Sequence, residues 1–281
     1  MPKIDLHVHS HYSDGTHSPS EVVELAHQKG IVALALTDHD TLDGIPETVA
    51  AGQTLGIDII AGIELSTIHH NQEIHLLAYG FDWQNPLLIH QITTLQASRN
   101  IRNSEAVTRL NELGLSLTYD EVKTIAGKGT VGRPHIAQVL MEKGYINTFQ
   151  EAFTQYLGEK APAYIPRDLP STTQAIEWIR QAGGVTSLAH PNWIKQKGKA
   201  FLTFCKELQE AGLHALEVFY STHTPRQISF FLQCTRQLDL LVTGGSDFHG
   251  THRPDIAIGV GRGNLKVPMT LLEPLRQAMK N

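Results

Sequence analysis

The segment at residues 31–37, with the sequence IVALALT, is the feature that most limits the fold of this chain. A strand with one face in water alternates apolar and polar residues, whereas this run is apolar at nearly every position. That pattern is typical of a strand buried on both faces of a parallel sheet. Because such a sheet is covered by helices, amphipathic helices should flank the run.

The neighbouring sequence supplies such helices. Ser18, Pro19 and Glu21 form a capping box with proline at the first helical position, and Ser171 and Gln174 begin another helix. Further helices are predicted at residues 46–55, 199–211 and 225–238, and further strands at 4–9, 58–65, 73–81, 185–189, 215–219 and 240–243. Seven strands separated by helices predict a parallel β/α barrel. An open doubly wound sheet is the alternative, but the chain has no dinucleotide or P-loop motif to support it.

The alternation stops in the middle of the chain. Helical patterns dominate there, at residues 87–113, 119–125, 133–143 and 148–157. We therefore divide the chain into a first barrel segment (1–81), a helical insertion that covers one end of the barrel as a substrate lid (82–170), and a second barrel segment (171–281).

Composition excludes several classes of protein. The formal charge is 23 − 28 = −5, which argues against a nonspecific nucleic-acid or membrane binder. Cys205 and Cys234 are too few for a disulfide framework or a thiolate metal site. The amino-terminal residues lack signal-peptide features, and no apolar run is long enough for a membrane span. We expect a cytoplasmic protein with no obligate protein partner.

Histidine is abundant, with 16 in the chain, and its placement follows the predicted strands. His7 and His9 end the first strand, and residues two apart on a strand point to the same side. Asp247 and His249 repeat this spacing after the last strand. The other candidate ligands at strand ends, or in the loops beside them, are Asp14, His39, Glu64, His75 and His190.

Together these side chains predict a metal centre, because functional residues of β/α barrels lie where the carboxyl ends of strands meet. Imidazole and carboxylate suit Mn²⁺, Zn²⁺, Fe²⁺ or Mg²⁺. Nine ligands exceed the needs of one ion, so we expect two or three divalent ions, Mn²⁺ foremost, with Glu64 as a bridging carboxylate. Ordinary surface or core positions are expected for the remaining histidines considered: His11, His17, His27, His69, His70, His90, His214 and His252.

The set resembles the motifs of the polymerase-and-histidinol-phosphatase (PHP) superfamily, here His7-x-His9, Asp14, Thr37-Asp38-His39, Glu64, His75, His190-Pro191 and Asp247-x-His249. The resemblance implies a distorted (β/α)7 TIM-like barrel with a trinuclear metal centre. It implies three ligand groups: His7, His9, Glu64 and Asp247; Glu64, His75 and His190; and Asp14, His39 and His249. Many relatives have histidine where Asp14 stands. We assign a direct catalytic part to His39, Glu64 and Asp247.

The insertion carries candidate substrate ligands. Arg99 and Arg102 are three residues apart on a predicted helix and share a face, and Arg133 and His135 follow in a Gly-Arg-Pro-His motif. Arginine is suited to phosphate recognition, although a solvated face is the ordinary alternative. The whole pattern resembles PHP enzymes that act on nucleotides, namely nucleoside 3′,5′-bisphosphate phosphatases and 5′-3′ exoribonucleases. His223, after the sixth strand, is a candidate to contact substrate or to protonate the leaving oxygen.

The predicted function is hydrolysis of phosphate monoesters of nucleotides, of the 3′,5′-bisphosphate or AMP type, through attack by a metal-activated hydroxide. The alternatives are 5′-3′ exoribonuclease action on short or 5′-phosphorylated RNA and a phosphatase of the histidinol-phosphate type. A non-catalytic metal-binding module is the third alternative, and it is disfavoured because every ligand position holds a competent residue.

Overall fold

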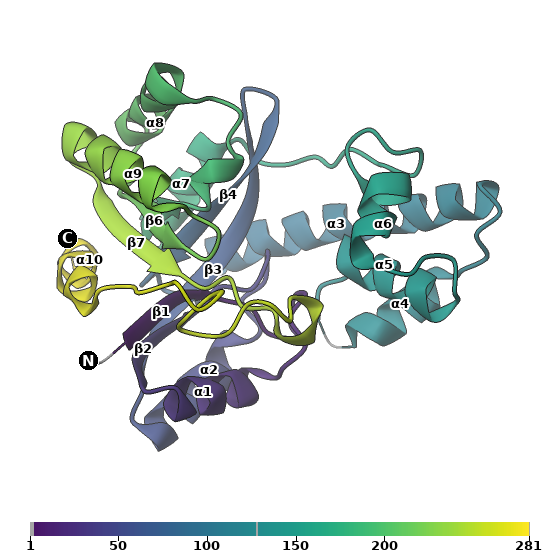
Figure 1. Ribbon diagram of the computed structural model, residues 1–281, viewed down its shortest axis with the longest axis horizontal. Coiled ribbons are helices and arrows are strands. Elements are labelled where there is room, and N and C mark those ends of the chain that lie inside the picture. The colour runs from purple at the N-terminus through teal and green to yellow at the C-terminus, as the bar shows by residue number, and fades with distance from the viewer. Residues whose placement is uncertain (1–2, 128, 281) are drawn as a thin grey trace.

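A computed structural model describes residues 3–127 and 129–280. Its strands form one seven-stranded sheet whose order follows the sequence. The strands are β1 (Lys3–Val8), β2 (Ile31–Leu36), β3 (Asp58–His69), β4 (Gln72–Tyr79), β5 (Val185–Leu188), β6 (Ala215–Tyr220) and β7 (Leu241–Gly245). A parallel bridge between Val8 and Phe248 brings the two edges together, so the sheet is a nearly closed barrel (Figure 1). The predicted barrel class is confirmed.

The expectation of a wholly parallel barrel is wrong at β4. β3 and β4 form an antiparallel hairpin, and β4 also pairs antiparallel with β5, while the other pairs are parallel. The connection consists only of His70 and Asn71, whose φ values of 49° and 57° suit a tight hairpin turn. A parallel crossover needs a dozen or more residues. β3 is also longer than predicted, so Glu64 lies within it rather than at its end.

Helices cover the outside of the barrel. They are α1 (Pro19–Gln28), α2 (Ile45–Leu55), α7 (Thr172–Gln181), α8 (Gly198–Glu210), α9 (Pro225–Leu238) and α10 (Leu272–Ala278). Both predicted capping boxes form, with Ser18 and Glu21 opening α1 and Ser171 and Gln174 opening α7. These caps satisfy free N–H groups at the helix starts, which explains why the boundaries were predictable from sequence.

The described residues between β4 and α7 form helices joined by loops. They include α3 (Pro86–Glu112), α4 (Tyr119–Ala126), α5 (Arg133–Glu142), α6 (Phe149–Ala152) and a π-helical turn (Phe153–Leu157). α3 reaches from the barrel into this group (Figure 1), and its far half shares a separate apolar core with α5 through Val107, Leu110, Ile136 and Leu140. Of the helices that the structure describes, none is long and apolar enough to cross a membrane.

Candidate metal centre

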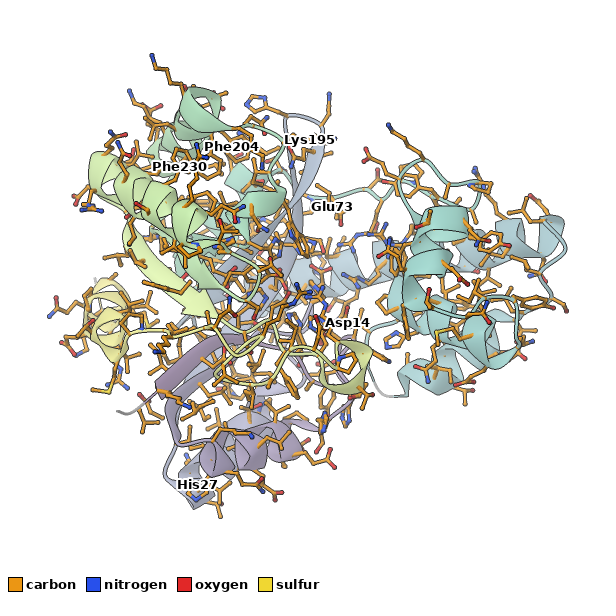
Figure 2. All side chains as sticks on the ribbon, viewed as in Figure 1. Asp14, His27, Glu73, Lys195, Phe204 and Phe230 are labelled. Carbon is orange, nitrogen blue, oxygen red and sulfur yellow. The ribbon has the colours of Figure 1, made fainter. Side chains whose placement is uncertain are left out.

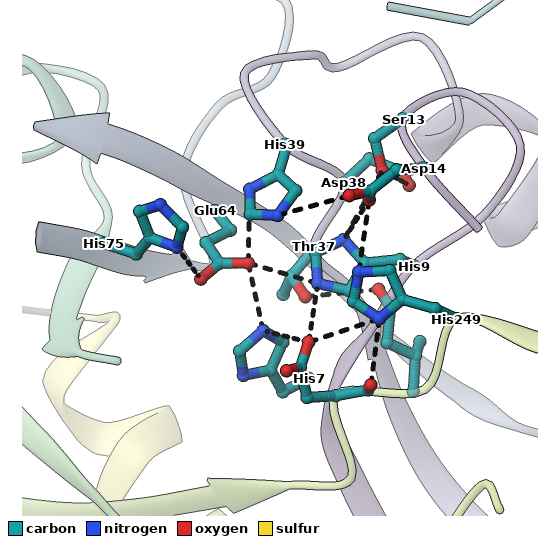
Figure 3. A network of polar contacts seen from close by, with 12 residues as sticks. His7, His9, Ser13, Asp14, Thr37, Asp38, His39, Glu64, His75 and His249 are labelled. Carbon is teal, nitrogen blue, oxygen red and sulfur yellow. Dashed lines mark hydrogen bonds and ion pairs between the residues drawn. The ribbon is translucent and has the colours of Figure 1, made fainter. Parts of the chain in front are cut away.

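All nine predicted ligands converge on the barrel mouth. Figure 3 labels all of them except His190 and Asp247. His7 and His9 come from β1 and the residues just after it, and Asp247 and His249 follow β7. Glu64 points into the group from β3. The remaining four come from the loops after β1 and β2, from β4 and from the residue pair after β5: Asp14, His39, His75 and His190. Parallel strands bring their carboxyl ends to one edge, which is why segments far apart in sequence meet there.

The first ligand group surrounds one point between β1, β3 and β7. His7 Nε2 lies 3.1 Å from Glu64 Oε2 and 3.3 Å from Asp247 Oδ1. His9 Nε2 lies 3.1 and 3.2 Å from the same two oxygens. The four side chains are buried. Two imidazoles and two carboxylates facing a common centre is the coordination chemistry of a divalent metal site.

The second group uses the other oxygen of Glu64. His75 Nδ1 and His190 Nε2 each lie 2.9 Å from Glu64 Oε1. His39 Nδ1 lies 3.4 Å from Glu64 Oε2, the oxygen of the first group, and His39, Glu64 and His75 also offer ligand atoms within 4.8 Å of one another. Glu64 therefore faces a histidine set with each oxygen, which is the arrangement of a carboxylate that bridges two ions.

The third group is looser. His249 Nε2 lies 3.2 Å from Asp14 Oδ1, while His39 Nε2 lies 3.9 Å from Asp14 Oδ2. His9 Nδ1, which sequence reasoning placed elsewhere, is 3.8 Å from Asp14 Oδ1. The chain around Asp14 is held by Asp38, which accepts hydrogen bonds from Ser10 and Ser13. These hydrogen bonds thus fix the loop that carries Asp14.

Two observations show that the group fits metal ions. His9 Nε2 and His39 Nδ1 are buried and face carboxylate oxygens at 3.1–3.4 Å, but within residues 3–127 and 129–280 neither atom forms a hydrogen bond of good geometry. Burial lowers the pKa of His9, but Asp247 and Glu64 overcome that and raise it to about 9. Burial raises the pKa of Glu64, yet His39, His7 and His75 hold it well below its ordinary value. The site therefore combines anionic carboxylates with imidazole nitrogens that face a common centre, which is the set of donor atoms that a divalent cation needs.

Residues behind the ligands orient them, and sequence reasoning missed these residues. Glu217, on β6, accepts from His7 Nδ1 at 2.8 Å and from the His190 backbone N–H at 2.6 Å. Tyr220 donates to Asp247 Oδ2 at 2.7 Å, and Arg253 pairs with the same oxygen. Asp247 Oδ1 is therefore left for the histidines. A glutamate inside the apolar run of β6 was the signal that could have identified Glu217, because a buried carboxylate requires partners.

Backbone strain accompanies the site. His190 and Asp247 have φ values of 27° and 58°, a region that non-glycine residues rarely adopt. Both are candidate ligands, and each lies two residues after the end of a strand. Such strain persists only where surrounding contacts enforce it, and it is concentrated at functional sites.

The predicted arginines gather beside this centre. Arg99 donates to Asp40 Oδ2 at 2.6 Å, and Arg167, which was not predicted, donates to the same oxygen at 2.9 Å. Arg102 is buried, and no carboxylate among the described residues forms an ion pair with it. Burial, together with Arg99, Arg133 and Arg167, lowers the pKa of Arg102 to about 8. Cations packed this closely, with so little anionic charge between them, favour an anionic ligand.

Two further predicted substrate ligands lie at the start of α5. Arg133 is half-buried, with its guanidinium 5.9 Å from the ring centre of Phe153. His135 Nδ1 accepts from the Gly132 N–H at 2.9 Å, which leaves the proton of the neutral ring on Nε2. Burial lowers the pKa of His135 to about 4, so the ring is neutral at pH 7.

The comparisons with known proteins agree with this site. The model of the PHP domain matches residues 5–165. A 5′-3′ exoribonuclease of Haemophilus influenzae is 34% identical over 88% of this chain and 90% of its own length. A 3′,5′-nucleoside bisphosphate phosphatase of Chromobacterium violaceum is 29% identical over 89% and 88%. A solved structure from Bifidobacterium adolescentis, a proposed metal-dependent phosphoesterase, has a TM-score of 0.89 and 30% identity, covering 99% and 96% of the two chains.

The chain belongs to the PHP family. Membership confirms the resemblance inferred from the histidine and carboxylate motifs, and the matched region carries six of the nine candidate ligands. The relatives are phosphatases and nucleases, so the predicted enzyme class, a hydrolase of phosphoric ester bonds, is confirmed as well. The PHP family is one of metal-dependent phosphoesterases, in keeping with the donor set at the mouth of the barrel.

Two other histidines of the chain have both ring nitrogens within hydrogen-bonding distance of protein atoms. His223 is buried, with Nδ1 2.8 Å from the Val218 carbonyl oxygen and Nε2 3.0 Å from Asn192 Oδ1. Both ring nitrogens therefore already face protein atoms. His252, assigned to an ordinary position, lies 2.8 Å from the Asp14 carbonyl oxygen and 3.1 Å from Gln138 on α5. His252 thus links the loop of Asp14 to the helical region.

Proposed function

We propose that this protein hydrolyses phosphate monoesters of nucleotides, with nucleoside 3′,5′-bisphosphates and AMP-like compounds as the substrate class. The main observation behind this proposal is that buried arginines lie beside the ligand groups. Arg102 has a guanidinium without a carboxylate partner in the described chain, next to Arg99 and Arg167 on Asp40. A second phosphate or a nucleotide backbone supplies the anion that this cluster favours.

The ligand groups support a proposal for the metal-binding residues. His7, His9, Glu64 and Asp247 would hold one ion; Glu64, His75 and His190 a second; and Asp14, His39 and His249 a third. Bound divalent ions, with Mn²⁺ as our choice, supply an activated water and neutralise charge on the phosphoryl oxygens. Glu64 and Asp247 contribute by keeping their charge, since their pKa values lie well below the ordinary range.

The remaining residues bind and orient the substrate. His135 presents its Nε2 proton as a donor, and Arg99, Arg102 and Arg133 bind phosphate. We propose that residues 82–170, which carry these side chains, act as a lid over the barrel mouth. For His223, both of whose nitrogens face protein atoms, we propose a contact with substrate through the Asn192 side chain that it positions.

The mouth also offers a surface for a nucleobase. Trp193 follows His190 and Pro191, its ring lies 4.2 Å from the His190 ring, and the residue is 50% exposed. An exposed aromatic ring beside a candidate metal ligand can stack on the base of a nucleotide whose phosphate reaches the centre.

A second candidate function is removal of nucleotides from RNA 5′ ends. A cavity of about 780 Å³ between α3 and α7 is lined by Arg102, Arg167, Ile101 and Trp178. It gives room for a following nucleotide beyond the arginine cluster. The overall charge of −5 gives no extended basic groove for long strands, so short RNA is favoured.

Release of inorganic phosphate from the small substrates, and of mononucleotides from the RNA, separates these possibilities. Adenosine 3′,5′-bisphosphate, AMP, histidinol phosphate and a short 5′-phosphorylated RNA are each incubated with Mn²⁺ and then with EDTA. Turnover that depends on Mn²⁺ and favours the bisphosphate is expected. Preference for the RNA would establish the second candidate function. Turnover of histidinol phosphate alone would contradict the assignment of a nucleotide substrate. No turnover of any of the four substrates would contradict the proposed hydrolase activity.

A further inference from the structure

Three potential metal ligands meet on the surface, away from the barrel mouth. His69 and His70 lie at the tip of the β3–β4 hairpin, which approaches α8, the helix that carries Glu207 (Figure 1). The Nε2 atoms of His69 and His70 lie 3.3 and 2.6 Å from one oxygen, Glu207 Oε2. The three ligand atoms all lie within 4.8 Å of one another. Two chain segments more than a hundred residues apart therefore contribute to one cluster.

The backbone explains why both imidazoles face the same helix. Consecutive residues of a strand normally point to opposite sides. Here the φ of 49° at His70 ends the extended conformation, and the two rings lie side by side with centres 4.3 Å apart. His69 is further held by Phe204 of α8 (Figure 2), whose ring meets it edge-on at 5.0 Å. One imidazole is thus fixed by packing before any ligand arrives.

The chemistry of the cluster suits a borderline divalent ion. Two imidazole nitrogens and one carboxylate oxygen form a three-ligand set that leaves a position for water, as in open zinc sites. Burial lowers the pKa of His69, which favours the neutral ring over the imidazolium. The side chains of His70 and Glu207 are 56% and 43% exposed, so an ion can enter from solvent.

We propose that His69, His70 and Glu207 form a second, surface metal site for Zn²⁺ or a similar transition-metal ion. A bound ion joins the hairpin tip to α8. The same hairpin carries Glu64 and His75 nearer the barrel mouth, where Glu64 pairs with Leu77 and His75 with Ser66 in the ladder. The surface ion therefore stabilises the two strands that supply the bridging carboxylate and a neighbouring candidate ligand.

Zinc stoichiometry tests this site on tag-free protein. Wild type, His70→Asn and Glu207→Gln are stripped of metal, equilibrated with Zn²⁺ by dialysis and analysed for bound zinc. Asparagine tolerates the positive φ at position 70, so the turn is kept. His27→Ala is the matched control, because His27 is an exposed histidine on α1, on the side of the molecule opposite α8 in this view (Figure 2).

Both site variants should bind about one zinc ion per chain fewer than wild type, as expected for loss of a three-ligand site. His27→Ala should match wild type. Mn²⁺-dependent phosphate release should be unchanged in all variants, which shows that the barrel centre is intact. Equal zinc content in wild type, His70→Asn and Glu207→Gln would overturn the proposal and leave the cluster as a hydrogen-bonded contact between hairpin and helix.

Discussion

His7 Nδ1 lies 2.8 Å from Glu217 Oε1, and both side chains are fully buried. A carboxylate only accepts hydrogen bonds, so Nδ1 of His7 donates to Glu217, and Nε2 is the ring nitrogen that faces Glu64 and Asp247. The other oxygen of Glu217 accepts from the His190 backbone. One carboxylate on β6 therefore orients residues of two ligand groups.

Glu217→Gln should weaken metal binding without removing a ligand. Loss of such an orienting carboxylate typically costs about 10–100-fold in metal affinity. The Mn²⁺ concentration for half-maximal phosphate release should rise by that order, with activity recovered at high Mn²⁺. Glu177→Gln on the exposed face of α7 is the control. An unchanged Mn²⁺ dependence would show that Glu217 is only a structural hydrogen-bond partner.

Glu64→Ala should abolish activity and lower the bound metal by more than one ion per chain. The physical reason is that each oxygen of Glu64 faces a different histidine group, so one substitution affects two sites. His249→Ala provides the comparison, because His249 belongs to the third group and should affect that ion alone. Metal analysis and circular dichroism are measured together. Near-normal turnover in folded Glu64→Ala would contradict the metal mechanism.

Arg102→Met should raise KM for a nucleoside bisphosphate by about 10–100-fold, the equivalent of one lost charge-assisted hydrogen bond. The effect on AMP should be smaller, since AMP lacks the second phosphate. Steady-state kinetics with both substrates give the comparison. Arg109→Met is the control, because Arg109 is exposed on the same helix. Equal KM changes for the two substrates would argue against binding of a second phosphate by Arg102.

Asp40→Asn should lower the free energy of unfolding by about 3–5 kcal/mol, because Arg99 and Arg167 would lose their buried partner. Burial raises the pKa of Asp40, but Arg167 and Arg99 hold it well below its ordinary value. A carboxyl group whose pKa is lower in the folded than in the unfolded state stabilises the folded protein. This contribution is fully present above the unfolded pKa, about 4, and is lost as the pH falls.

The difference in unfolding free energy between wild type and Asp40→Asn should therefore begin to shrink below about pH 5, where the unfolded carboxylate takes up its proton, and continue to shrink as the pH falls toward the much lower folded pKa. Urea unfolding at a series of pH values measures it. A difference that stays constant across this range would contradict the charge pairing.

Trp193→Ala should raise KM for AMP by about 10-fold, because base stacking contributes about 1–3 kcal/mol. KM for ribose 5-phosphate, which has no base, should not change. The exposed Trp193 ring lies on His190, so kcat for both substrates is also informative. Equal losses with both substrates would mean that Trp193 positions His190 instead of binding a base.

Local signals in the sequence account for most of the helices. Ser18 with Glu21 and Ser171 with Gln174 satisfy free N–H groups within four residues, so these helix starts require no tertiary information. The hairpin between β3 and β4 was not predicted as such. His70-Asn71 lacks the glycine that usually marks such a turn, and the antiparallel pairing depends on neighbouring strands.

The sequence by itself determined the barrel class and the nine candidate ligands, because strand periodicity and i, i+2 spacing are local properties. Only the tertiary structure decided which ligands share an oxygen of Glu64, that Glu217 orients His7 across 210 residues of chain, and that Asp40 pairs with Arg99 and Arg167. These contacts join segments far apart in sequence. Barrel closure and the packing of α3 bring them together, and no local pattern encodes that arrangement.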